Sequence, residues 1–324
     1  MNQALKSDPS FDPHFLQSVT EGLGWAEKCL SSRYFYDDRG SELFAQIMKL
    51  PEYYLTRSEM QIFTEQSNLI CQSLDIKADK LEVVELGAGD GSKTQHLLKQ
   101  LLKSDAQITY RPIDISSGAL SSLKQQMHTA LPDLTIQILC GDYFEKLEQL
   151  QETVQQKLVL FIGSNLGNLD DTQAKSFIQR LSNTLNPGDY LMLGLDMIKP
   201  EQIVLPAYSD AAGITAEFNL NLLRRINREL DANFDLGSFK HVAEYQESEG
   251  FARSYLQSLK HQTVTLGASG DQFTFQQGEK IHTEISRKYS DELLAELIQG
   301  CQLTLERKFT DTKGYFADYL LQKS

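Results

Sequence analysis

Apolar residues follow two different periods through the middle of the chain. Between about positions 81 and 195, short apolar runs typical of buried strands alternate with segments whose apolar residues recur every three or four positions, as on one face of a helix. The expected strands are 81–86, 107–114, 135–142, 157–163 and 190–195, and the expected helices are 94–102, 117–130 and 170–185. This alternation predicts a doubly wound α/β sheet with helices on both of its faces.

The pattern changes after residue 197 and returns near residue 289. The elements expected in this part are a helix over 216–230, short strands at 253–259 and 261–266, a helix over 290–300, and a terminal hairpin of 302–309 and 315–321. We therefore expect two domains. One is made of 61–197 and 289–324, and a smaller α+β domain is made of 1–60 and 198–288.

Composition narrows the classes of partner. The chain has 324 residues with 41% hydrophobic and 23% charged residues, which is ordinary for a globular protein with an ample core. Its net charge of −13 disfavours a nucleic-acid partner, because such binding depends on Lys and Arg displacing counterions. No apolar stretch approaches the roughly 20 residues that span a bilayer. These features favour a small-molecule substrate and no membrane or nucleic-acid partner.

Cysteine and histidine spacing gives no sign of a metal site. The four cysteines, Cys29, Cys71, Cys140 and Cys301, contain no C-x-x-C pair, and the six His residues are scattered. Residues 1–8 also lack the apolar core of a signal peptide. We therefore expect a cytoplasmic protein without a bound metal.

A glycine-rich turn after the strand 81–86 carries the strongest chemical signal. Gly87, Gly89 and Gly91 can take positive φ and let the backbone approach a ligand, and the helix expected at 94–102 points its N-terminus at the same place. Such a turn is typical of a site that binds a nucleotide or another adenosine compound.

Three classes of adenosine ligand use a turn of this kind. A dinucleotide fingerprint, G-x-G-x-x-G, and a P-loop, G-x-x-x-x-G-K-[ST], both require glycine at position 92, where this chain has Ser92. S-adenosylmethionine (SAM) sites of class I methyltransferases combine an E-x-G-x-G turn with acidic residues after the next two strands. Glu85, Gly87 and Gly89 supply the turn, and Asp114 and Asp142 supply the acidic residues. The pattern favours SAM over a nicotinamide cofactor or a nucleoside triphosphate.

Five further segments resemble the histidine-specific Nα-methyltransferases that make hercynine for ergothioneine biosynthesis. They are 36–44 (YDDRGSELF), 50–59 (LPEYYLTRSE), 163–169 (GSNLGNL), 207–215 (AYSDAAGIT) and 283–288 (TEISRK). The resemblance extends from about residue 33 to residue 321. It implies a class I SAM-dependent, Rossmann-like methyltransferase domain with a terminal antiparallel hairpin, joined to a smaller substrate-binding domain, with the amino acid bound between the two.

The resemblance also assigns roles to individual residues. It implies that the methyl donor contacts Tyr36, Gly87, Lys93, Asp114, Asp142 and Tyr143. Tyr36 is the catalytic candidate, because it would lie near the sulfonium and the reacting amine. The residues implied for the substrate are Asn168 and Tyr208 for its α-amino and α-carboxylate groups, and Tyr53, Glu284 and Ser286 for its imidazole.

The residue pattern alone allows two interpretations of the segment implied to bind the imidazole. Alternation over 281–286 places His282, Glu284 and Ser286 on one face of a strand, where they form either a solvated face or a polar lining for a ligand. One position departs from the family, since Ser254 stands where histidine-specific relatives carry Met. Because the family also contains enzymes that methylate the amine of tryptophan derivatives, its reaction is better specified than its substrate.

The expected activity is transfer of methyl groups from SAM to the α-amino group of L-histidine, giving hercynine and S-adenosylhomocysteine. We expect a monomer whose partner is a small amino acid. The alternatives are an Nα-methyltransferase for another aromatic amino acid or amine and, less favoured by the glycine turn, a nicotinamide-dependent oxidoreductase.

Overall fold

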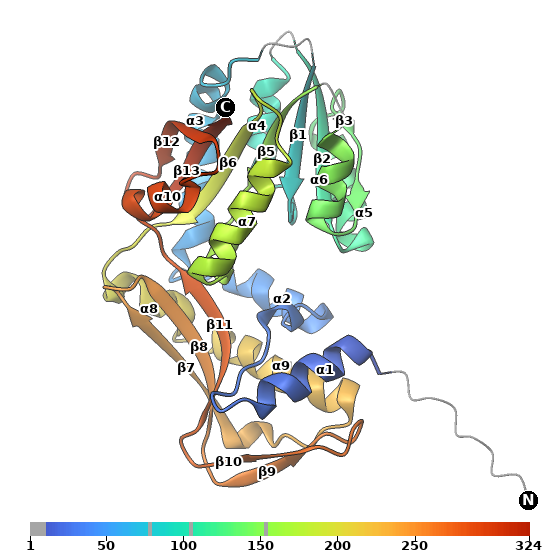
Figure 1. The fold of residues 1–324 in the computed structure, drawn as a ribbon, viewed down its shortest axis with the longest axis vertical. Helices are drawn as coiled ribbons and strands as arrows, with labels where there is room; N and C mark the ends of the chain where they lie inside the picture. Colours follow the sequence, from blue (N-terminus) through green and yellow to red (C-terminus); the bar gives the residue numbers. More distant parts are fainter. Residues whose placement is uncertain (1–10, 77–79, 104–105, 152–154) are drawn as a thin grey trace, which may run out of the picture. The chain divides into compact units, whose positions relative to one another are not determined.

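The computed structural model describes residues 11–76, 80–103, 106–151 and 155–324, so the N-terminal stretch 1–8 considered above lies outside the described residues. The chain divides into two compact units (Figure 1). The first consists of Met1–Tyr53 and Pro200–Ser286, and the second of Tyr54–Lys199 and Arg287–Ser324. A boundary at residue 60 would cut helix α3 (Tyr54–Gln72), which lies wholly in the second unit.

A mostly parallel sheet forms the centre of the second unit. Its strand order is β12-β13-β6-β5-β1-β2-β3, with β4 also paired to β2. The strands are β1 (Lys80–Leu86), β2 (Gln107–Asp114), β3 (Thr135–Ile136), β4 (Leu139–Cys140), β5 (Gln156–Phe161), β6 (Tyr190–Asp196), β12 (Leu303–Thr310) and β13 (Phe316–Lys323). Strand β13 is antiparallel to both β12 and β6. The doubly wound sheet and the terminal hairpin predicted from the sequence are thus confirmed.

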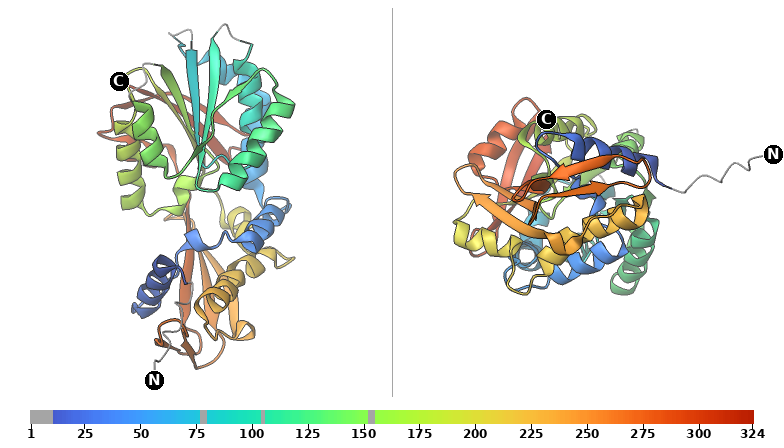
Figure 2. Two further views of the ribbon diagram at one scale, coloured as in Figure 1. Left: turned by 90° about the vertical axis from the view of Figure 1, so that its right-hand side faces the viewer. Right: turned by 90° about the horizontal axis from the view of Figure 1, so that it is seen from below.

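Helices cover both faces of this sheet (Figures 1 and 2). The helices of one face are α3, α4 (Thr94–Leu101) and α5 (Ser117–Ala130), and those of the other are α6 (Tyr143–Gln151), α7 (Asp171–Asn183) and α10 (Asp291–Ile298). In β1, Val83 packs into the first of these two cores and its neighbour Val84 into the second, and both are fully buried. Burial on both faces explains why the strand is an unbroken apolar run.

The prediction of one continuous strand over 135–142 was wrong. The segment forms two short strands, β3 paired at Thr109–Tyr110 and β4 paired at Ile113–Asp114 of β2. The interruption lies opposite Pro112 of β2, whose ring nitrogen has no hydrogen to donate to the ladder. Helix α6, which the sequence analysis did not predict, follows directly and buries Phe144, Leu147 and Leu150.

The first unit is built around a three-stranded antiparallel sheet, β11-β8-β7, with a separate hairpin, β10-β9. Its strands are β7 (Phe239–Gln246), β8 (Phe251–Ser258), β9 (Gln262–Thr265), β10 (Gln272–Phe275) and β11 (Lys280–Arg287). Its α-helices are α1 (Pro13–Gly24), α2 (Asp38–Ile47), α8 (Glu201–Tyr208) and α9 (Ile214–Leu230). One stripe of α9, including Phe218, Leu222 and Ile226, packs into the core of this unit. The helix predicted over 216–230 is therefore confirmed.

A buried ionic cluster lies at the end of β6 in the second unit. The carboxylate of Asp196 pairs with Lys288 at 2.8 Å and with Lys199, and accepts a hydrogen bond from Tyr54 at 2.8 Å. Asp196 and Lys288 are 0% exposed. Burial would favour the neutral acid, yet the two ammonium groups hold the pKa of Asp196 below its ordinary value. The cluster therefore contains a charged aspartate.

No helix in the described part of the chain is both long enough and apolar enough to cross a membrane.

Candidate functional site

The glycine turn after β1 has the backbone that the sequence predicts. Gly87, Gly89 and Gly91 adopt φ of 69°, 56° and 68°, values that side-chain-bearing residues rarely take. A Cβ on Gly87 would lie 2.8 Å from the Tyr143 hydroxyl, whereas a Cβ on Gly89 would meet nothing within 4 Å. The turn is therefore packed on one side by Tyr143 and open at Gly89.

Glu85, near the end of β1, supports this turn through its side-chain hydrogen bonds. It is 2% exposed and accepts hydrogen bonds from the Thr94 hydroxyl at 2.7 Å and from the Tyr110 hydroxyl. Burial raises the pKa of Glu85 to about 7, although these two hydrogen bonds oppose the shift. Glu85 thus joins β1 to the first residue of α4 and to β2, so its role is to hold the turn.

Three predicted donor-site residues meet beside Gly87. Asp114, the last residue of β2, accepts a hydrogen bond from the Ser116 amide at 2.9 Å. Asp142 accepts from the Phe144 amide at 3.0 Å and so caps the start of α6. Burial, together with the charges of Asp114 and Asp142, raises the pKa of Tyr143 to about 12. The phenol therefore stays protonated, beside two carboxylates oriented by backbone amides.

Lys93 supplies the positive charge on the other side of the turn. It precedes α4, and its ammonium pairs with Glu59 of α3. Burial alone would lower its pKa, but the carboxylate of Glu59 raises the pKa of Lys93 above its ordinary value. A Cβ on Gly163 would lie 3.6 Å from the Lys93 ammonium. The structure thus brings Lys93 to the loop that follows β5.

That loop carries Asn168. Gly163 and Ser164 take positive φ, and the 3-10 helix η2 (Asn165–Asn168) follows. Asn168 is exposed and ends η2. Among the residues of this loop that bear a side chain, Ser164 and not Asn168 therefore takes the left-handed turn conformation.

The remaining predicted residues come together in the first unit. The Tyr208 hydroxyl donates to the Ser286 hydroxyl at 2.8 Å. The Tyr36 ring is 47% exposed, but the protein around its hydroxyl, followed by Glu284 and Tyr208, raises the pKa of Tyr36 above its ordinary value. Tyr36 and Tyr53 both place their rings edge-on to Phe44, with centroid distances of 5.5 and 6.2 Å. Four segments of the first unit thus converge.

Ser254 of β8 lies beside this group. It is 1% exposed, and its hydroxyl is 3.5 Å from a carboxylate oxygen of Glu284. Thr283, on the opposite face of β11, donates to Asn219 of α9 at 2.8 Å. The strand that carries Glu284 is therefore fixed from both sides, which suits a side chain that must hold one orientation.

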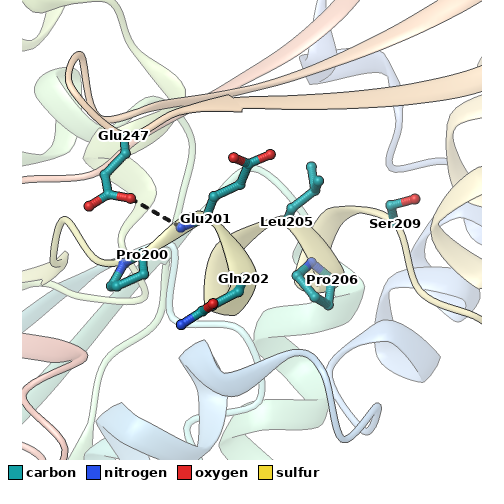
Figure 3. Close-up of a pocket in the computed structure, with 7 residues that line it drawn as sticks. All are labelled: Pro200, Glu201, Gln202, Leu205, Pro206, Ser209 and Glu247. Carbon is teal, nitrogen blue, oxygen red and sulfur yellow. Dashed lines mark hydrogen bonds between the residues drawn. The ribbon is translucent and has the colours of Figure 1, made fainter.

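A hollow in the first unit lies apart from these residues. It has a volume of about 530 Å³ and is lined by Pro200, Glu201, Gln202, Leu205, Pro206, Ser209 and Glu247 (Figure 3). Glu247 accepts a hydrogen bond from the Glu201 amide at 3.3 Å and so occupies the start of α8. None of the predicted site residues lines this hollow, which is a junction between α8 and the loop after β7.

Sequence reasoning missed two residues that organise the donor side, Glu59 and Asp318. Glu59 ends the segment 50–59 and was given no role, and Asp318 lies in the apolar strand β13. An acidic residue in a strand buried on both faces is a signal that could have identified Asp318. The partners of both residues depend on tertiary structure.

Comparison with known proteins gives consistent matches over both units. The family model described as histidine-specific methyltransferase, SAM-dependent, matches residues 15–323. The chain is 38% identical to the histidine N-alpha-methyltransferase of Mycolicibacterium smegmatis over 93% of this chain and 92% of that protein. It is 35% identical to the histidine N-alpha-methyltransferase of Mycobacterium tuberculosis, over 95% of this chain and 94% of that protein. It is also 30% identical to ergothioneine biosynthesis protein 1 of Schizosaccharomyces pombe, over 95% of this chain and 40% of that protein.

Proposed function

Because this chain belongs to the family of histidine-specific, SAM-dependent methyltransferases, we propose that it transfers methyl groups from SAM to the α-amino group of L-histidine. The product is hercynine, the trimethylated betaine that serves ergothioneine biosynthesis. The observation that carries this proposal is similarity across both units, since a shared SAM fold alone would not extend through the first unit. The nicotinamide alternative has no comparable support.

We propose that the second unit binds the methyl donor and the first unit supplies most of the substrate contacts. Among the six residues assigned to the donor, Lys93 is the one cation, and it suits the carboxylate of the methionine portion of SAM. Asp114 suits the ribose hydroxyls, because an ionised carboxylate accepts two hydrogen bonds. Asp142, Tyr143 and Gly87 would contact the rest of the adenosine.

The polar group of the first unit supports recognition of a neutral imidazole. Glu284 can accept a hydrogen bond from one ring N–H, and the Ser286 hydroxyl can donate to the other ring nitrogen. The Tyr208 hydroxyl donates to Ser286 and so helps to position the Ser286 hydroxyl. Tyr53 would contact the same ring, and Asn168 and Tyr208 are the residues proposed for the α-amino and α-carboxylate groups.

The protein forms no covalent bond to the substrate or the donor during methyl transfer. The amine lone pair attacks the methyl carbon in line, the carbon–sulfur bond breaks, and its electron pair stays on the sulfur of S-adenosylhomocysteine. Alignment supplies most of the rate, provided that the amine is unprotonated. Because its pKa is raised, Tyr36 is a neutral phenol and suits a hydrogen-bond acceptor for the amine, with the released proton passing to water. Its ring would also stabilise the methylated cation.

We further propose that the protein acts as a monomer in the cytoplasm. The four cysteines are free, in keeping with a reducing compartment.

The proposed activity is tested by incubating the purified protein with SAM and each of the aromatic amino acids, and by following the products by mass spectrometry. We expect mono-, di- and trimethylated histidine, with an equivalent amount of S-adenosylhomocysteine. Methylation of tryptophan or tyrosine with no histidine product would instead favour the aromatic-amine alternative.

Replacing Glu284 by alanine is expected to reduce kcat/KM for histidine. The reduction should correspond to a loss of about 1 to 3 kcal/mol of transition-state stabilisation, because a desolvated imidazole N–H would lose its acceptor. Apolar aromatic amines should lose less, since the variant site is wider and carries one negative charge fewer. The measurement compares kcat/KM for histidine and tryptophan. Glu249→Ala is the control, because it removes a carboxylate from the loop before β8 that pairs with Arg253 at 3.1 Å. Equal losses for both substrates in Glu284→Ala would refute the imidazole assignment.

Replacing Tyr208 by phenylalanine is expected to weaken histidine binding by about 1 kcal/mol while leaving the melting temperature nearly unchanged. The phenol donates to Ser286, so its loss frees that hydroxyl to turn away from the imidazole. Calorimetry in the presence of S-adenosylhomocysteine measures the affinity. Tyr34→Phe is the matched control, since Tyr34 is equally buried and donates to the His14 carbonyl at 3.3 Å. A variant that melts early but binds histidine normally would make Tyr208 a purely structural residue.

A further inference from the structure

The buried carboxylate of Glu59 contacts two segments near the proposed site of the methyl donor. Glu59 of α3 is 1% exposed. One of its oxygens accepts a hydrogen bond from the Gly163 amide at 2.7 Å, and the other pairs with the Lys93 ammonium. A single side chain therefore contacts both the residue before α4 and a residue of the loop between β5 and Asn168. Neither Lys93 nor Gly163 adjoins Glu59 in sequence.

A second carboxyl group lies against Glu59 from the sheet. Asp318 of β13 is 0% exposed, and neither of its carboxyl oxygens accepts a hydrogen bond from a donor in the described part of the chain. It is paired in register with Gly194 of β6, where a Cβ would lie 2.5 Å from a Glu59 oxygen and 2.9 Å from an Asp318 oxygen. A glycine at position 194 is thus what leaves space for the two acids to meet.

The charges of this group balance when Asp318 is protonated. Burial, followed by the neighbouring charge of Glu59, raises the pKa of Asp318 well above its ordinary value. A protonated Asp318 can donate to Glu59, and the remaining charges are then the carboxylate of Glu59 and the ammonium of Lys93. Ionisation of both acids would leave a net negative charge in a desolvated position, which is costly.

We propose that Glu59 is a positioning residue that fixes Lys93 and the Gly163 loop for binding of the methyl donor. The inference rests on the proposed SAM site and extends it, because neither acid is assigned to that site by sequence. Glu59 is not a base for the reaction, since it is buried and both of its oxygens are engaged. Its effect reaches the ligand through the charge and position of Lys93.

The first test replaces Glu59 by glutamine, alone and together with Asp318→Asn, so that Asp318 cannot take the place of Glu59 as a counter-charge. The groups facing Lys93 are Glu59 of α3, Asp318 of β13 and Glu85 of β1. In the double variant burial dominates, so the pKa of Lys93 falls and the ammonium is lost as the pH rises. Affinity for S-adenosylhomocysteine should drop about tenfold and weaken further between about pH 7 and 10, whereas the wild type stays flat.

Two conservative variants complete the design. Asp318→Asn keeps a donor toward Glu59 and should bind S-adenosylhomocysteine like the wild type, with the same flat pH profile. Glu59→Asp keeps the charge but withdraws it by one methylene, so affinity should fall without a new pH dependence. Wild-type affinity in Glu59→Asp, or a flat profile in the folded double variant, would overturn the inference, as would a pH-dependent loss in Asp318→Asn.

Failure of this inference can be told apart from failure of the proposed function. A wild-type protein that does not bind S-adenosylhomocysteine would refute the function itself. If the wild type binds and Lys93→Met binds equally well, the role of Lys93 is wrong, and the positioning role of Glu59 fails with it. If Lys93→Met binds weakly while the Glu59 variants bind normally with a flat pH profile, only the positioning role is refuted.

Discussion

Replacing Asp196 by alanine should lower the free energy of unfolding by about 3 to 5 kcal/mol, because two buried ammonium groups would lose their counter-charge. Lys199 and Lys288 both pair with this carboxylate, and they are 5% and 0% exposed. The expected effect is therefore much larger than that of a typical substitution.

The measurement is urea unfolding of the wild type and the variant at neutral pH. Glu148→Ala is the control, because Glu148 pairs with Arg180 at 3.4 Å on the surface, where both side chains are more than half exposed. That change should cost less than about 1 kcal/mol. Because Asp196 has a lowered pKa in the folded state, its contribution is present at neutral pH and is lost as the pH falls through that pKa. Comparable losses in the two variants would contradict the role given to Asp196.

The residues of the Asp196 cluster lie close to the points where the chain passes from one unit to the other. The chain passes between the units after residues 53, 199 and 286. Tyr54 and Lys199 adjoin two of these points, and Lys288 lies two residues beyond the third. All three side chains meet at Asp196, and Lys199 also donates to the Tyr54 hydroxyl at 3.0 Å. The cluster therefore joins residues at or next to three of the four segment ends of the second unit.

The sequence predicted the fold of the second unit well because its strands are buried on both faces. Val83 and Val84 face different cores, so apolar runs were a sufficient signal for β1 and its neighbours. The apolar pattern was not sufficient where single residues determine the local backbone structure. Pro112 interrupts the pairing of the segment 135–142, and Asp142, interpreted as a ligand contact, also caps the unpredicted helix α6.

The candidate site was predictable only in part. Glycine spacing located the turn at Gly87, and the family segments supplied the other residues. Contacts between distant residues were beyond sequence reasoning, because they depend on topology. Tyr208 and Ser286 are 78 positions apart, and Glu59 and Gly163 are 104 apart. The roles of Glu59 and Asp318 beside Lys93 became apparent only in the structure, where helix α3 packs against the sheet that contains β13.

Replacing Asp114 by alanine is expected to reduce affinity for S-adenosylhomocysteine by about 3 kcal/mol, on the order of a hundredfold. The carboxylate lies at the end of β2, oriented by the Ser116 amide at 2.9 Å. Two charge-assisted bonds to the ribose hydroxyls would be lost together. Asp114→Asn should lose less, since one oxygen remains to accept a hydrogen bond.

Asp90→Ala provides a matched control for this experiment. Asp90 lies in the glycine turn and accepts a hydrogen bond from the Ser92 amide at 3.0 Å, the same local contact that Asp114 makes with Ser116. The control therefore removes an equivalent turn-closing bond and an equivalent charge without removing the proposed ribose contact. Calorimetry should show a small loss for Asp90→Ala and a large one for Asp114→Ala. Similar affinities for the two variants would mean that β2 does not hold the ribose, even in a protein that methylates histidine.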